Sequence, residues 1–163
     1  MNGSLCNHAF RKPLMEKLTT AEDFLLKADS VLKNYIEVYP VNVPYSDDLL
    51  TAFWCATRLI GPVLSRPSFV QAIIGKPPFE IPIGHHRLIF AQSDAAVATA
   101  WKGFILLNHE ALRKYDVTMQ TASVLEEFVH TMMAISDDHL ARIVVAHLFE
   151  KVSATSTGYV LRS

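Results

Sequence analysis

The feature that most constrains the fold is a helical period in the hydrophobic residues of the last third of the chain, up to about residue 152. Apolar residues recur there every three or four positions, as they do on the packed face of an amphipathic helix. Ser136 and the two aspartates after it interrupt the pattern, and such residues favour the first turn of a new helix. The sequence therefore predicts helices over residues 118–134 and 137–152, separated near Ser136.

The segments upstream indicate a mixed architecture. Two short apolar runs bounded by polar residues are typical of strands, and three prolines between them and the N-terminal half argue for an irregular connection. Helical spacing and capping residues predict helices before that connection. The expected elements are helices over residues 20–39, 46–61 and 67–75, an irregular run over 76–84, strands over 87–92 and 103–108, and a helical turn over 95–101. We expect one α+β domain, mostly helical, with a small sheet and a C-terminal helix pair.

Composition excludes several classes of protein. The chain has 163 residues, half of them hydrophobic and 19% charged, which fits one folded domain. A net charge of −1 without a basic block argues against nucleic-acid binding, and no apolar run is long enough for a membrane span. Cys6 and Cys55 cannot form a disulfide framework, and the first ten residues do not resemble a secretory signal. These features predict a soluble cytoplasmic protein with a loosely ordered N-terminus (1–18) and a flexible tail (153–163).

Carboxylates and histidines gather on the two C-terminal helices. Glu126, Glu127 and His130 fall on one side of the first helix, where they could also be an ordinary solvated face. His147 falls among apolar residues of the second helix and is therefore expected to be buried and hydrogen-bonded. If the helices fold back at the break, Glu126 and Glu127 come level with His147, and such groups can bind a divalent metal.

Roughly residues 87–152, with a strand ending at Asn108, a polar connection and the helix that carries His130, resemble the core of the zincin-type metallopeptidases, which carry His-Glu-x-x-His on the active helix. Here that motif reads Glu126-Glu127-Phe128-Val129-His130. The resemblance implies that Glu127 takes a proton from metal-bound water and that His130 and Glu126 ligate zinc, with Glu126 in place of the first histidine. It also implies a third ligand on the next helix, for which the candidates are His147 and Glu150, with Asp138 and His139 behind them.

Two functions follow from these patterns. The leading one is a zincin-like, zinc-binding protein, either a divergent metallopeptidase-type hydrolase or one that has lost catalysis. The alternative is a non-enzymatic interaction module, in which Tyr45, Phe53 and Trp54 of the helical half form a surface for a protein or peptide partner. The substrate and the oligomeric state stay open.

Overall fold

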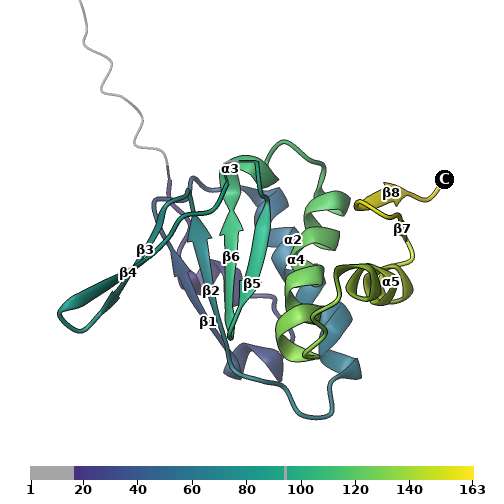
Figure 1. Cartoon of the computed structure of the whole chain (residues 1–163), viewed down its shortest axis with the longest axis horizontal. Coiled ribbons are helices and arrows are strands. Elements are labelled where there is room, and N and C mark those ends of the chain that lie inside the picture. Colours follow the sequence, from purple (N-terminus) through teal and green to yellow (C-terminus); the bar gives the residue numbers. More distant parts are fainter. Residues whose placement is uncertain (1–16, 94) are drawn as a thin grey trace, which may run out of the picture.

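The computed structural model of the chain describes residues 17–93 and 95–163. Residues 1–16, which include Cys6 and most of the segment expected to be loosely ordered, lie outside the described part. The rest forms one α+β fold, in which helices pack on one face of a four-stranded sheet (Figure 1). Among the described residues, no helix combines the length and apolar character required to cross a membrane.

The sheet contains three parallel strands and one antiparallel edge strand. Its order is β1 (Ile36–Pro40), β2 (Val70–Gly75), β6 (Phe104–Asn108) and β5 (Ala98–Trp101), and only β5 runs antiparallel to its neighbour. Helix α2 (Asp47–Ile60) makes the crossover between the parallel strands β1 and β2. Within residues 17–93 and 95–163, this arrangement leaves β5 with one unpaired edge.

Helices α2 and α4 (Val117–Met132) pack against each other over the sheet. Phe24, Phe53 and Phe128 link them to α1 (Ala21–Leu25) through edge-to-face ring contacts with centroid separations of 5.3 and 5.6 Å. The remaining helices are α3 (His109–Leu112) and α5 (Asp138–Leu148). The predicted helix over 46–61 and the two predicted C-terminal helices are confirmed to within a few residues at each end.

Two antiparallel hairpins complete the fold. Strands β3 (Phe79–Ile83) and β4 (His86–Phe90) form an arm that projects from the sheet in Figure 1, and Phe79 packs on the uncovered sheet face with Ile73 and Leu106. Strands β7 (Val152–Ala154) and β8 (Tyr159–Leu161) form the second hairpin, in the segment expected to be a flexible tail. The strands predicted over 87–92 and 103–108 are found as β4 and β6.

The helix predicted over residues 20–39 is wrong beyond its first turn. The expected capping box is present, because Thr20 and Asp23 bond each other's backbone amides. The helix ends at Leu25, and the Asp29 carboxylate then accepts the amides of Val31 and Leu32 at 2.9 and 3.0 Å, which holds a turn. After this turn, buried and exposed residues alternate in β1, so the chain changes from a helical period to that of a strand.

Three further predictions before the C-terminal helices are wrong. The segment predicted as a short helix over 67–75 contains β2, the expected helical turn over 95–101 contains β5, and the supposedly irregular run over 76–84 contains β3. The last of these is an outer hairpin strand, a position where proline is tolerated. Strand β2 lies between two parallel neighbours and is almost wholly buried, so its apolar run has no alternation that would distinguish it from a helix.

The end of α4 yields a first prediction. Ala134 follows the helix with a φ of 54°, in the left-handed region, where a Cβ atom costs about 1–2 kcal/mol and glycine avoids that cost. We expect Ala134→Gly to raise the free energy of unfolding by about 1 kcal/mol in urea denaturation. The control Ala122→Gly, at a buried position inside α4, should lower it. A less stable Ala134→Gly protein would contradict the left-handed end of α4.

Candidate functional site

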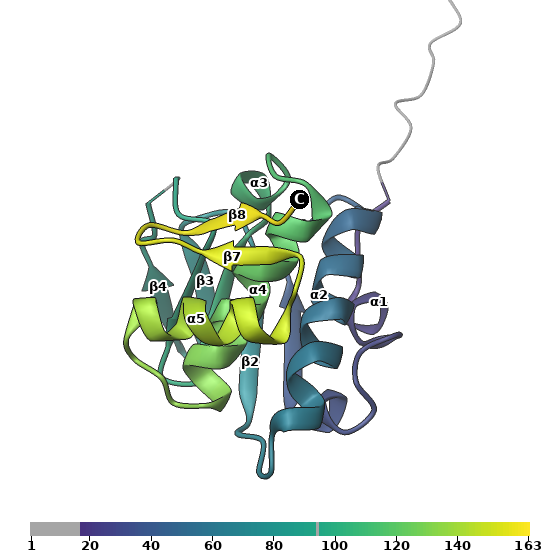
Figure 2. The same ribbon diagram turned by 90° about the vertical axis from the view of Figure 1, so that its right-hand side faces the viewer.

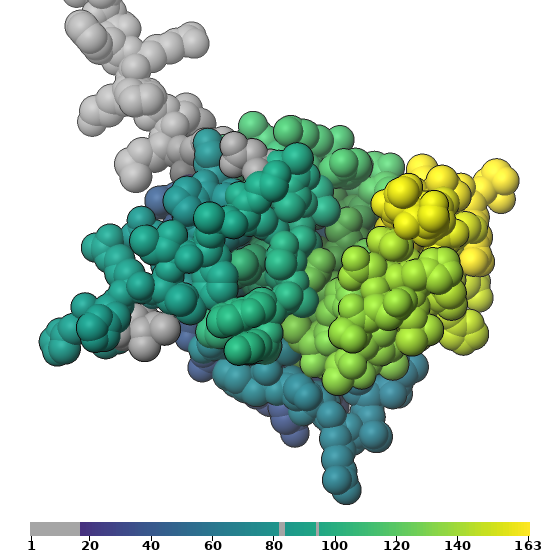
Figure 3. All heavy atoms as spheres, in the orientation of Figure 1, coloured from purple at the N-terminus to yellow at the C-terminus, as the bar shows by residue number. Residues whose placement is uncertain are grey.

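A cleft of about 730 Å³ lies between α4 and the edge strand β5. Figure 3 shows it as a recess between the strand side of the molecule and the α4–α5 segment. One wall consists of residues 97–103. The other consists of side chains from α4 and from the turn into α5, namely Glu126, Glu127, His130, Thr131, Ala134, Ile135, Ser136 and Asp138.

A tight turn holds β5 in place as the first wall. Lys102 and Gly103 join β5 to β6 with φ angles of 45° and 85°, and Trp101 pairs with Phe104 on either side of them. Two consecutive positive φ angles define the type of two-residue turn that matches the twist of a β-hairpin. The strand β6 occupies one edge of β5. No strand of the described part of the chain pairs with the other edge, which lies on the side of the cleft.

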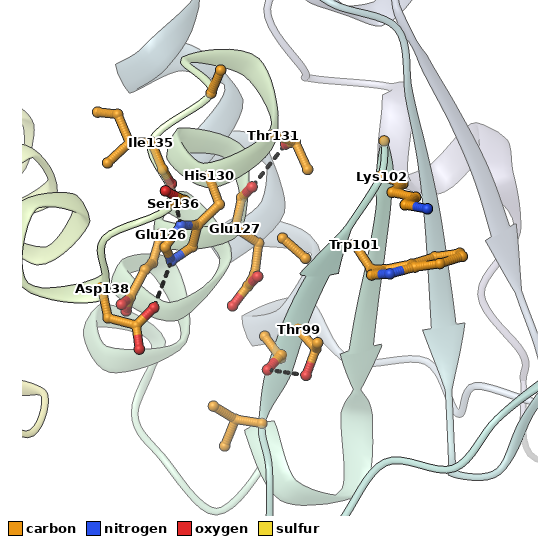
Figure 4. Close-up of a pocket in the computed structure, with 15 residues that line it drawn as sticks. Thr99, Trp101, Lys102, Glu126, Glu127, His130, Thr131, Ile135, Ser136 and Asp138 are labelled. Atoms are coloured by element: carbon orange, nitrogen blue, oxygen red, sulfur yellow. Dashed lines mark hydrogen bonds and ion pairs between the residues drawn. The ribbon is translucent and has the colours of Figure 1, made fainter.

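Glu127 is the deepest polar group of the cleft. Its side chain points into the space between α4 and β5 (Figure 4), and the residue is only 8% exposed. Burial, together with the nearby charges of Glu126 and Asp138, raises the pKa of its carboxyl group to about 8. Its Oε2 atom has no hydrogen-bond partner among the described residues. At neutral pH Glu127 is therefore mostly protonated, and its hydroxyl can donate a hydrogen bond within the cleft.

Glu126 is held by residues from outside α4. The Tyr159 hydroxyl on β8 donates a 2.8 Å hydrogen bond to its Oε2 atom, and Nη1 of Arg142 on α5 lies 3.8 Å from Oε1. Burial raises the pKa of Glu126, and the bonds to Tyr159 and Arg142 partly oppose that rise. Burial also raises the pKa of Tyr159, so its hydroxyl remains a donor. Three chain segments thus fix one carboxylate.

His130 lies at the mouth of the cleft, with its side chain 15% exposed. Its Nδ1 atom donates to the backbone carbonyl of Ile135, an oxygen that can only accept, so this nitrogen carries a proton. Its Nε2 atom lies 3.6 Å from Oδ1 of Asp138 (Figure 4). The imidazole is therefore oriented by the turn that follows its own helix.

The predicted burial of His147 is wrong, because its side chain is exposed, as is that of Glu150. Neither residue lines the cleft. The two C-terminal helices do not lie antiparallel as expected, because α5 runs across α4 (Figure 2). As a result, Arg142 is the α5 residue that contacts Glu126. The side of α5 that carries His147 faces away from the core.

The interaction surface expected on the helical half is mostly not exposed. Phe53 is fully buried between the rings of Phe24 and Phe128 and is not available to a partner. Trp54 is half-buried, and its ring nitrogen donates to the carbonyl of Asp23. Of the three aromatic residues proposed for that surface, Tyr45 alone is exposed.

The residues of the cleft do not fit a metal ion as they are arranged. Within residues 17–93 and 95–163, no three His, Cys, Asp or Glu side chains converge as a metal site requires. The contacts give the reason. Glu126 accepts a hydrogen bond from Tyr159 and forms an ion pair with Arg142, while Glu127 is buried and mostly protonated. Of the predicted ligands, the structure brings Glu126 and His130 to the cleft and leaves His147 and Glu150 outside it.

Sequence reasoning missed Arg142, Tyr159 and the whole of β5. Tyr159 lies 33 residues from Glu126, in a segment whose composition is that of a flexible tail. Arg142 on its own is an ordinary surface residue of a helix, and nothing in its spacing indicates a buried partner. The turn at Lys102 and Gly103, between Ala98–Trp101 and the apolar run of β6, was the one available signal for a hairpin.

Comparison with known proteins adds no relative. No family model matches the chain, and no curated protein and no solved structure matches it significantly.

Proposed function

We propose that this chain is a zincin-like domain that has lost its metal centre and that binds an extended peptide segment in the cleft between α4 and β5. The observation that carries the proposal is the free edge of β5, which lies along a cleft with a protonated, unpartnered carboxyl group at its base. An exposed sheet edge beside a cleft is a common way for a protein to bind an extended peptide.

The comparison with zincins is supported by the order of elements around the motif. Strand β6 ends at Asn108, the short helix α3 follows, and α4 carries the sequence from Glu126 to His130. This is the strand, connection and helix on which the resemblance was based. The motif side chains line the cleft between α4 and β5 instead of a solvated helix face.

The register of β5 identifies the groups that a peptide would bond. The amide of Asn108 donates to the carbonyl of Val97, which fixes the pairing of the two strands. Hydrogen-bonded pairs alternate in an antiparallel ladder, so Thr99 and Trp101 bond to β6 while Ala98 and Ala100 direct their amides and carbonyls to the free edge. These two residues are the expected partners of an added strand.

The polar groups of the cleft suit a neutral backbone better than a cation. The protonated Glu127 carboxyl can donate to a peptide carbonyl, which would satisfy a buried polar group that otherwise lacks a partner. Arg142 already balances the charge of Glu126 at the inner wall. A volume of about 730 Å³ accommodates a short segment of several residues.

A proline substitution tests this proposal. Ala100→Pro removes one amide from the free edge without breaking a bond to β6, and proline is tolerated on edge strands. Using a fluorescein-labelled mixture of casein-derived peptides as the probe, we expect anisotropy titrations to show at least tenfold weaker binding than for wild type. The control Ala100→Val has a side chain of comparable size but keeps the amide, and should bind nearly as well as wild type. Equal binding by the proline and valine variants would exclude strand addition at β5.

A metal-dependent hydrolase is the second candidate, and the environment of Glu127 favours it. A buried carboxyl group with a pKa near 8, inside a cleft, is the type of group that accepts and returns protons in catalysis. On this proposal Glu126 and His130 would have to leave their present partners to hold zinc. If the wild type hydrolyses peptides, Glu127→Gln should abolish the activity while the fold is kept.

A further inference from the structure

The outward side of α5 is an apolar surface that nothing in the described molecule covers. Leu140 and Ile143 are 48% and 47% exposed, and His147 lies one turn beyond on the same side of the helix. We call these three residues the α5 stripe. The opposite side of the helix, with Ala141 and Val145, is fully buried.

The periodicity of α5 and its observed packing disagree. The sequence groups His147 with Leu140 and Ile143 as a packing face, and the structure places that face outward. Helices of monomeric proteins normally direct their charged residues to solvent, so an outward stripe led by leucine and isoleucine is unusual. The stripe residues are not buried within one chain, and contact with another molecule would bury them.

The apolar surface extends beyond the helix. Hairpin β7–β8 lies next to α5 on the side of the molecule that faces the viewer in Figure 2. Val160 of β8 is 52% exposed and lies on the side of the strand opposite to Tyr159, whose hydroxyl reaches inward to Glu126. An 11-residue helix is only about 16 Å long, so the hairpin supplies area that a stable interface would need.

The charges at the ends of α5 select the partner. Asp137 and Asp138 give the beginning of the helix two negative charges. Lys151 and Arg162 flank its end, where Arg162 donates to the carbonyl of Ala146, and Glu150 offsets one of these positive charges. Two copies of α5 packed antiparallel would place the acidic end of each against the basic end of the other. Their helix dipoles would point in opposite directions, which is the favourable arrangement.

We infer that the protein forms a two-fold symmetric dimer through the α5 stripe of two copies packed antiparallel. A symmetric dimer uses the same surface twice, which requires self-complementarity of the kind that α5 has. Ile143 stands at the midpoint of Asp138–Leu148 and would therefore lie at the two-fold axis. None of the three stripe residues lines the cleft, so substitutions within the stripe leave the cleft lining unchanged.

Sedimentation velocity over a wide range of protein concentration tests this inference. We expect a monomer–dimer equilibrium for the wild type and at least a tenfold larger dissociation constant for Ile143→Glu. The control Leu26→Glu replaces an apolar residue that is 73% exposed on another part of the molecule, and it should behave as the wild type does. A wild type that stays monomeric throughout, or a dimer that Ile143→Glu leaves intact, would overturn the inference.

A cross-linking experiment tests the geometry. Under mild oxidation Ile143→Cys should form a disulfide-linked dimer, because the introduced thiols meet at the two-fold axis. The wild type, with Cys6 and Cys55, and the variant Leu26→Cys should remain largely uncross-linked under the same conditions. Cross-linking of Leu26→Cys to the same extent, or none for Ile143→Cys, would contradict the antiparallel arrangement.

Discussion

Glu127→Gln is expected to make the protein more stable than wild type above about pH 8, by a few kcal/mol. The pKa of Glu127 is about 8 in the folded protein and near 4.5 in the unfolded chain, so between these values the folded state holds a proton that the unfolded state has released. The free energy of unfolding therefore falls as the pH rises, by up to about 1.4 kcal/mol per pH unit. The contribution is fully present below about pH 4.5 and is lost as the pH passes through about 8. Glutamine is neutral throughout and removes this dependence.

Urea denaturation at several pH values between about 4 and 9 measures the effect as the difference between the variant and wild type. The difference should be small at the acidic end and should increase in favour of the variant until about pH 8. Glu150→Gln is the matched control, because Glu150 is exposed and outside the cleft, and its curve should follow that of the wild type. Parallel curves for Glu127→Gln and wild type would show that Glu127 is not held as a buried neutral acid.

The second large effect concerns zinc. Glu126→His gives the complete His-Glu-x-x-His pattern. In the wild type Nη1 of Arg142 lies 3.8 Å from Oε1 of Glu126, so its guanidinium would remain beside the new histidine. Two unit charges about 4 Å apart interact with roughly 4 kcal/mol in the environment of a protein surface, so this cation opposes a divalent ion strongly. We expect zinc affinity to rise at least tenfold from wild type to Glu126→His. We expect at least another tenfold rise in Glu126→His/Arg142→Gln.

Competition with a fluorescent chelator gives the affinity and the stoichiometry, and thermal unfolding gives an independent readout. Adding His130→Ala to the double variant should abolish the gain, because His130 is the second ligand of the motif. Its Nε2 atom faces Asp138, which is a candidate for a third ligand. Zinc that stabilises the wild type itself would favour the hydrolase over the peptide-binding cleft. Absence of stoichiometric zinc binding in the double variant would remove the basis for a zincin-like metal centre in this chain.

The sequence predicts the elements whose signals are local. Ser46 caps α2 by accepting the amide of Leu49, and Asp116 caps α4 in the same way, so those helices begin where the side chains require. The apolar run of β6 is a strand because it is short and ends at Asn108. For these elements a window of about ten residues contains the determining interactions.

The predictions fail where distant pairing decides the conformation. The segment after Leu25 has a helical spacing of apolar residues, but pairing of Ile36 with Val70 makes the following residues a strand. Strand β5 has no apolar run of its own and exists because it pairs with β6 across a two-residue turn. Pairing of this kind depends on residues that a local pattern does not include.

The candidate site shows the same division. The spacing of Glu126, Glu127 and His130 correctly predicts that they share one side of α4. The groups that they contact depend on the angle at which α5 crosses α4, and the spacing of residues within each helix does not predict that angle. As a result Arg142 takes the position expected for His147, and the side of α5 that carries His147 faces outward.

The contacts of Glu126 also bear on how the motif can change during evolution. A change to histidine at this position alone would leave the guanidinium of Arg142 without its carboxylate and the hydroxyl of Tyr159 without its acceptor. Buried polar groups without partners destabilise a fold, so the single substitution passes through a less stable protein. Changes on α5 and β8 would have to come first or together with it. Glutamate at position 126 is therefore coupled to residues on two other elements, and the identity of this one side chain constrains what α5 and β8 can carry.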